Sequence, residues 1–209
     1  WQKNVKVKSN LTTFYKDIVL FKQSLPVNIT AGQINILTSS PNQRKIIYSV
    51  ISANQEEIRI LNFDNDSSYL IKALDKKSYS RLEFAGWSPG QNQALFKETL
   101  KSGNIYFIID LDNLAYINLG DIADMNFDEV KWDTSSDNFL YGLAKKTIYQ
   151  IDLSQPAFTD ILAGSIQTFA VSGNDIYYIS SEQNNLYLYQ KNWTSGNNIL
   201  AEKIKIPKA

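Results

Sequence analysis

The chain of 209 residues contains neither cysteine nor histidine. Without cysteine it has no disulfide framework and no thiolate zinc site. Without histidine it lacks the usual general base and the commonest metal ligand. A Ser-His-Asp or Cys-His mechanism therefore cannot be assembled from these residues.

An excess of charge of one sign is also lacking. Lys plus Arg and Asp plus Glu number 21 each, so the formal net charge is zero. Proteins that bind nucleic acid or membrane surfaces normally carry a basic excess, so we expect no nucleic-acid partner. No apolar run approaches the length of a transmembrane helix, and no signal peptide is present. Because the sequence starts at Trp1, we expect a piece of a longer protein, with any membrane contact made by segments outside this chain.

What the sequence does contain is a repeat. Three turn segments are each followed, nine positions after their first residue, by an aromatic residue inside an apolar run. The pairs are Ser39 with Tyr48, Trp87 with Phe96, and Trp132 with Tyr141, and a fourth copy with a shorter turn runs from Ser172 to Tyr178. A period of roughly 40 to 50 residues with several short β-rich runs is typical of β-propeller blades.

Two further sets of strands accompany these repeats. Inner strands are expected near 34–38, 82–87, 129–132 and 166–170. After a polar link, β-rich runs follow at 58–61, 105–108, 148–151 and 186–189, and three of them lead into Asp64, Asp110 and Asp152.

The sequence therefore predicts an all-β fold, a β-propeller of about five four-stranded antiparallel blades in a single domain over 1–209. The first blade is partial or divergent, with its outer strands expected at 18–21 and 26–30. Either the blades close a small ring, with 203–206 completing a blade begun at the other terminus, or the chain is an arc of a larger propeller. The approximate blades are 1–32, 33–76, 77–120, 121–163 and 164–209.

The turn at 88–91 reads Ser-Pro-Gly-Gln and predicts a type II turn. Proline presets φ at the second position, and glycine tolerates the positive φ of the third. Trp87 and Trp132, which end the preceding strands, are expected to fill the gap between neighbouring sheets. The strand after each turn is an almost continuous apolar run, as in a sheet covered on both faces. We therefore interpret the turns and aromatic residues as structural.

The stretch Trp87-Ser88-Pro89-Gly90, with Leu95-Phe96 and the later Ile105-Tyr106 and Asp110, resembles the TolB-like repeat of WD-repeat-like propellers. That family's pattern is W-S-P-D-G, a hydrophobic strand, and then an I-Y-x-x-D strand. This chain lacks the aspartate between Pro89 and Gly90, and its third copy replaces Ser-Pro with Asp133-Thr134. The resemblance covers roughly 33–200 and implies a fold rather than an activity. It also implies a periplasmic or surface location, where such repeats often serve as scaffolds for protein contacts. Such repeats also occur as gating propellers attached to serine peptidases.

Two loops are expected on the face that carries the fourth-to-first and second-to-third connections. Loop 75–81 has three basic residues and loop 120–129 has four acidic ones. They would form a polarised binding face with a cation site at Asp121, Asp124 and Asp128, or simply be solvated loops that attract each other weakly.

Other acidic segments have plainer interpretations. Asp64-Asn65-Asp66 resembles the start of a calcium loop but lacks its glycine and distal glutamate, so we expect a polar turn there, as at 110–113. Carboxylate pairs are the one catalytic option left, as in propeller glycosidases, and the inner strands offer only Glu83 and Glu129. Asn-x-Ser/Thr triplets matter only if the source glycosylates secreted proteins, and they start at Asn10, Asn28, Asn65 and Asn192.

We accordingly expect no catalytic residue, cofactor or metal, and the sequence identifies no ligand-binding residue. The expected function is a non-catalytic binding or scaffold module that recognises protein or glycan through loops on one face. Its expected location is periplasmic, extracellular or at the cell surface. One alternative is a substrate-gating propeller of a hydrolase whose catalytic domain lies elsewhere. A second is a propeller glycosidase, which would need three convergent carboxylates in an axial pocket.

Overall fold

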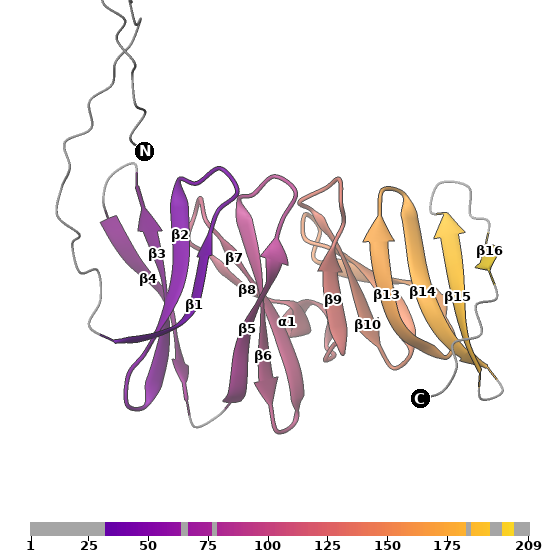
Figure 1. Ribbon diagram of the computed structural model, residues 1–209, viewed down its shortest axis with the longest axis horizontal. Helices are drawn as coiled ribbons and strands as arrows, with labels where there is room; N and C mark the ends of the chain where they lie inside the picture. The colour runs from indigo at the N-terminus through magenta and orange to yellow at the C-terminus, as the bar shows by residue number, and fades with distance from the viewer. Residues whose placement is uncertain (1–31, 64–66, 77–78, 183–184, 193–197, 203–209) are drawn as a thin grey trace, which may run out of the picture. The chain divides into compact units, whose positions relative to one another are not determined.

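The computed structural model describes residues 32–63, 67–76, 79–182, 185–192 and 198–202. Within them, the strands form four separate antiparallel sheets of four strands each. In every sheet the strands pair in chain order, as a meander. Sheets A to D, as we name them along the chain, are seen in Figure 1.

The strands of the four sheets have the following bounds. Sheet A contains β1 (Gln33–Ser39), β2 (Lys45–Ile51), β3 (Gln55–Asn62) and β4 (Ser67–Asp75). Sheet B contains β5 (Tyr79–Trp87), β6 (Gln93–Leu100), β7 (Gly103–Asp110) and β8 (Tyr116–Asn118), and the short helix α1 (Leu119–Ala123) follows it. Sheet C contains β9 (Glu129–Trp132), β10 (Phe139–Ala144), β11 (Thr147–Asp152) and β12 (Ala157–Ala163). Sheet D contains β13 (Ile166–Ser172), β14 (Asp175–Glu182), β15 (Asn185–Asn192) and β16 (Asn198–Glu202).

These sheets confirm the predicted all-β architecture of four-stranded blades. The expected inner strands coincide with β1, β5, β9 and β13, and the expected later runs coincide with β3, β7, β11 and β15. The outer strands expected at 18–21 and 26–30, and the segment 203–206, lie outside the described residues. The division into five blades therefore stays a prediction.

Three hydrophobic clusters hold consecutive sheets together. In β6, the side chains of Ala94 and Phe96 pack toward sheet A, whereas Leu95 packs toward sheet C. This two-sided burial explains the unbroken apolar runs and confirms the expectation of covered sheets. Trp87 packs in the cluster between sheets A and B, and Trp132 in the one between B and C, as expected. For the part of the chain that the structure describes, no cluster joins sheet A to sheet D, so ring and arc both remain predictions.

The turn at 88–91 differs from the predicted type II turn. Gln91 N donates to Ser88 O at 3.0 Å, which closes the turn, but the positive φ of 65° belongs to Gln91 and not to Gly90. This is the pattern of a type I turn followed by a left-handed residue. Gly90 has a different role, because a Cβ there would lie 2.0 Å from Asp137 Oδ2 of the next sheet. Its backbone N donates to Asp137 Oδ1 at 2.6 Å, so glycine permits a close contact between turns of sheets B and C.

The aromatic residues of the repeat do not all face the same way. Trp87 pairs with Ala94, seven positions on, whereas Trp132 pairs with Leu140, eight positions on. The extra residue turns Tyr141 toward sheet D and places Gly142 where sheet B has Phe96. The equivalence of Phe96 and Tyr141 inferred from their spacing is therefore wrong by one residue.

Candidate functional site

The segment 119–128 connects β8 of sheet B to β9 of sheet C, and we call it the crossover. Hydrogen bonds fix it at both ends. Asn118 caps α1, since its Oδ1 accepts from Gly120 N at 3.0 Å and its Nδ2 donates to Asp121 Oδ1 at 2.9 Å. Asp124 ends the helix with φ 48°, a left-handed conformation that aspartate tolerates better than most residues. Further on, Asp128 N donates to Leu143 O at 2.7 Å, which ties the crossover to sheet C.

Tyr106 fastens the same crossover to sheet B. Its hydroxyl donates to Asp128 O at 3.2 Å. Burial raises the pKa of Tyr106 to about 12, and the nearby carboxylate of Glu129 adds to the shift. The hydroxyl is thus a neutral donor at physiological pH, and it anchors the loop rather than acting as a base.

A cleft of about 280 Å³ opens at this crossover, and we call it the polar cleft. Two carboxylate residues and three asparagines are among the residues that line it, together with the buried Tyr106 and Phe127. Pockets for drug-sized ligands usually measure about 300–1,000 Å³, so this one suits a single side chain or sugar ring. The residues that line it are Asn104, Ile105, Tyr106, Asn118, Gly120, Asp121, Asp124, Met125, Asn126 and Phe127.

The structure contradicts the predicted cation site. Asp121 and Asp124 line the polar cleft, but Asp128 does not. Throughout the described ranges, no group of three acidic side chains is placed to hold a metal ion. The four carboxylates of the loop are spread along a crossover whose path is set by backbone bonds, so they do not converge.

The basic loop 75–81 is described only in part. Arg81 belongs to β5 and pairs with Glu83 at 3.0 Å in its own strand. No ion pair links 75–81 to 120–129 among the residues that the structure describes, which exclude 77–78. The polarised face formed by the two loops therefore stays a prediction.

Glu83 and Glu129, the two inner-strand carboxylates, each contact a cationic side chain: Glu83 pairs with Arg81, and Glu129 pairs with Lys131. Glu83 also lies 4.0 Å from Lys97, which faces sheet C. Glu129 pairs with Lys131 at 2.9 Å and accepts a hydrogen bond from Thr168 Oγ1 of sheet D at 2.8 Å. Both carboxylates thus take part in ionic contacts, and a pair that flanks one glycosidic bond stays a prediction.

The remaining acidic candidates are turn residues, as the sequence indicated. Asp110 Oδ1 accepts from Asp112 N at 2.9 Å and from Asn113 N at 3.2 Å. Asp152 Oδ1 makes the same kind of contacts with Ser154 N and Gln155 N, at 2.8 and 3.3 Å. Hydrogen bonds from Ser154 and Gln155 hold the pKa of Asp152 below its usual range. The segment 64–66 lies outside the described residues.

The four glycosylation triplets are only partly visible. Asn10, Asn28 and Asn65 lie outside the described residues. Asn192 ends β15, where its Nδ2 donates to Asp175 Oδ1 at 2.6 Å.

A second cleft, of about 220 Å³, lies between sheets A and B, and we call it the turn-edge cleft. Sequence analysis missed it because its walls come from β2, β3 and β4 together with the β7–β8 turn. An apolar residue within a polar turn, Leu114, was the one available signal. The cleft is lined by Lys45, Ile60, Asn62, Tyr69, Leu111, Asp112 and Leu114.

The described residues include no helix of the length and apolarity needed to cross a membrane. Neither a protein-family model nor a curated protein matches the sequence.

Solved structures do resemble this chain. TolB from Acinetobacter baumannii gives a TM-score of 0.53 at 14% identity, covering 84% of this chain and 45% of that one. An uncharacterised protein from Listeria monocytogenes gives 0.58 at 18% identity, covering 81% and 52%. The β-propeller domain of the Trilobed protease from Pyrococcus furiosus gives 0.54 at 12% identity, covering 84% and 58%.

These similarities confirm the resemblance to TolB-like and other β-propellers that the turn sequence indicated. At such low identities they concern the fold alone. The chain spans about half the length of the first two of these structures.

Proposed function

We propose that this TolB-like propeller is a non-catalytic binding module that contacts a protein partner through the polar cleft. The supporting observation is a crossover held rigidly between two sheets, with the carboxylates of Asp121 and Asp124 at the cleft. Recognition residues are often carried by loops on a rigid scaffold. Carboxylates beside the side-chain amides of Asn104 and Asn126 suit a Lys or Arg side chain of the partner.

Two features support a role without catalysis. The chain has no histidine or cysteine to serve as base or nucleophile. Its two inner-strand glutamates, Glu83 and Glu129, are each engaged with a cation. The resemblance to TolB-like repeats further supports a location outside the cytoplasm, in the periplasm or at the cell surface.

A peptide titration followed by NMR tests the role of the polar cleft. The probe is acetyl-Gly-Arg-Gly-amide, with the same peptide carrying Gln in place of Arg as the neutral control. We expect the Arg peptide to shift the backbone amides of 118–127. The double variant Asp121→Asn with Asp124→Asn should weaken this binding at least about tenfold, since it removes the charges that pair with the guanidinium. Asparagine also tolerates the left-handed backbone at 124.

The control variant is Asp160→Asn, an exposed aspartate in β12, which should leave the titration unchanged. Equal binding by the double variant, or shifts confined to other regions, would contradict the proposal. A neutral disaccharide that shifts the same amides when the Arg peptide does not would make the partner a glycan.

A second candidate is a propeller that gates substrate access to a hydrolase. The similarity to the propeller domain of the Trilobed protease favours it. An α/β-hydrolase sequence encoded next to this segment in the parent gene would support gating. Its absence from the parent protein would leave the binding module as the better account.

A further inference from the structure

The turn between β7 and β8 presents an exposed leucine in an unusual backbone conformation. Leu114 has a φ of 58° and is 38% exposed. Apart from glycine, asparagine and aspartate, residues rarely adopt this left-handed conformation, because their Cβ then crowds the backbone. An observed backbone outlier of this kind supports a hypothesis of function.

Hydrogen bonds fix the turn that carries Leu114. Asp110 N donates to Ala115 O at 2.9 Å, and Asp110 Oδ1 accepts from the two backbone amides described above. Asn113 Oδ1 accepts from Ala115 N at 2.8 Å. Leu114 is therefore held in place between bonded neighbours before any partner arrives.

Leu114 lies on the wall of the turn-edge cleft. Ile60 and Leu111, which are buried, contribute apolar atoms to the lining, and Tyr69 is 37% exposed. A volume of about 220 Å³ is below the range of drug-sized pockets but above that of a cavity known to hold benzene. The cleft therefore has room for one Leu- or Phe-sized side chain.

The accessible charge at this cleft is negative. Lys45 Nζ donates to Leu111 O at 3.0 Å and lies 3.4 Å from Asp112 Oδ1. The Lys45 side chain is only 20% exposed, whereas that of Asp112 is 64% exposed. A cation on a partner would therefore meet the carboxylate of Asp112 rather than the ammonium of Lys45.

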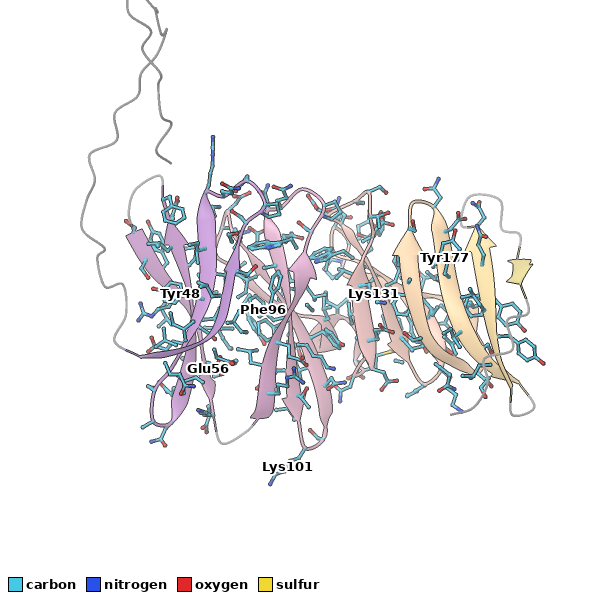
Figure 2. The ribbon with its side chains drawn as sticks, in the orientation of Figure 1. Tyr48, Glu56, Phe96, Lys101, Lys131 and Tyr177 are labelled. Carbon is cyan, nitrogen blue, oxygen red and sulfur yellow. The ribbon has the colours of Figure 1, made fainter. Side chains whose placement is uncertain are left out.

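We infer that the turn-edge cleft docks a protein segment that places an apolar side chain beside a lysine or arginine. This surface is independent of the polar cleft. In a meandering sheet the β1–β2 and β7–β8 turns lie at the same end of the strands. The β6–β7 turn, with Lys101 at its tip, lies at the opposite end (Figure 2). Asn104 of the polar cleft follows that β6–β7 turn, so the two clefts lie at opposite ends of the strands.

NMR titration with matched tetrapeptides tests this docking site. The probe is acetyl-Gly-Phe-Arg-Gly-amide, and the two controls replace Phe with Ser or Arg with Gln. We expect the probe to shift the amides of 111–115 and of Tyr69, the Ser peptide to fail, and the Gln peptide to bind more weakly.

Two variants separate a docking role from a structural one. Leu114→Asn removes the apolar side chain but suits the left-handed backbone, so it should unfold at the same or a higher temperature while binding falls at least about tenfold. Asp112→Asn should weaken binding of the Arg peptide and leave the Gln peptide unaffected. The matched control is Lys146→Asn, an exposed residue with φ 64° in the β10–β11 turn, which should not change binding.

Several outcomes would overturn the inference. One is the absence of saturable shifts at 111–115 with the Phe-Arg peptide. Another is equal binding by Leu114→Asn, or a lower unfolding temperature of that variant, since either would make Leu114 a structural residue. Shifts at 111–115 that depend on protein concentration without peptide would assign the cleft to a second copy of this chain instead.

Discussion

At the scale of single residues, Gly142 leaves room in the core for the side chain of Phe127. A Cβ at this position would lie 2.5 Å from Phe127 Cδ1, and Phe127 is 2% exposed. The ring of Phe127 thus fills, beside Gly142 of sheet C, the space that the Phe96 side chain fills at the equivalent position of sheet B. A residue from the crossover therefore completes the core between sheets B and C and also lines the polar cleft.

We expect Gly142→Ala to lower the free energy of unfolding by about 1–3 kcal/mol, because overpacking a dense interior forces side chains out of preferred rotamers. Phe127→Ala should cost about 3–5 kcal/mol by leaving a cavity. The double variant should cost less than the two single losses together, since the added methyl group enters that cavity. Urea unfolding followed by tryptophan fluorescence measures all three.

The control for this comparison is Gly164→Ala. There the nearest atom to an added Cβ is Ile166 Cγ1 at 3.8 Å, an ordinary contact. This variant should change the free energy of unfolding little. Strict additivity of Gly142→Ala and Phe127→Ala would show that the two positions do not share one space.

At the scale of elements, the turn after β9 is joined to β10 by a buried hydrogen bond. Tyr141 Oη donates to Asp133 Oδ2 at 3.1 Å, and Asp133 Oδ1 accepts from Ser135 N at 2.7 Å. Burial raises the pKa of Tyr141 to about 12, with the nearby Asp133 carboxylate also contributing. The tyrosine therefore stays a donor, and the buried carboxylate stays bonded on both oxygens.

Tyr141→Phe should destabilise the protein by roughly 1–3 kcal/mol, because it leaves one buried carboxylate oxygen without this donor. Thermal unfolding measures the effect. Tyr177→Phe in β14 serves as control and should change stability less, since its ring is only half-buried. Equal effects of the two substitutions would show that the Tyr141 hydroxyl contributes nothing through Asp133.

The elements also show what the sequence could and could not predict. Strands were predictable because burial on both faces leaves long apolar runs, as in β6 and β10. The turn at 88–91 was not, because Gly90 makes a close contact with Asp137 of the β9–β10 turn, which local sequence does not reveal. One extra residue in the turn before β10 reversed the face of Tyr141, since side chains alternate along a strand.

The clefts were less predictable still. The polar cleft combines Asn104 with the crossover, and the turn-edge cleft combines Lys45 with Leu114. Residues of these types are common on protein surfaces, and only the packing of successive sheets brings them together. The sequence did mark the acidic loop that lines the polar cleft, but it assigned that loop three converging carboxylates that the fold keeps apart.

At the scale of the whole molecule, few groups can make stability depend on pH near neutrality. Histidine, whose ordinary pKa lies between about pH 5 and 8, is absent. The pKa of the Glu98 carboxyl group is shifted toward neutrality, because this residue is 8% exposed in β6 on the face toward sheet A. Burial raises its pKa above the usual 4.5, and the charge of Lys72 opposes this shift.

The sign of the effect follows from linkage. A carboxyl group whose pKa is raised by folding contributes stability below its unfolded pKa and loses that contribution as the pH rises through its folded pKa. Glu98→Gln cannot ionise, so its stability relative to the wild type should increase as the pH rises above 4.5. The pKa of Asp152 is lowered from its ordinary value of 3.8, so the effect of this group on stability has the opposite sign. Its contribution is present above pH 3.8 and is lost as the pH falls below that value.

Thermal unfolding of both proteins at a series of pH values, starting below 4.5 and rising to neutrality, measures the difference. Lys72→Met is the informative companion, because removing the cation that favours the ionised form should raise the pKa of Glu98 further and steepen the loss of stability with pH. A constant difference between Glu98→Gln and the wild type across this range would contradict the argument. It would mean that the interface between sheets A and B admits enough water to solvate the carboxylate.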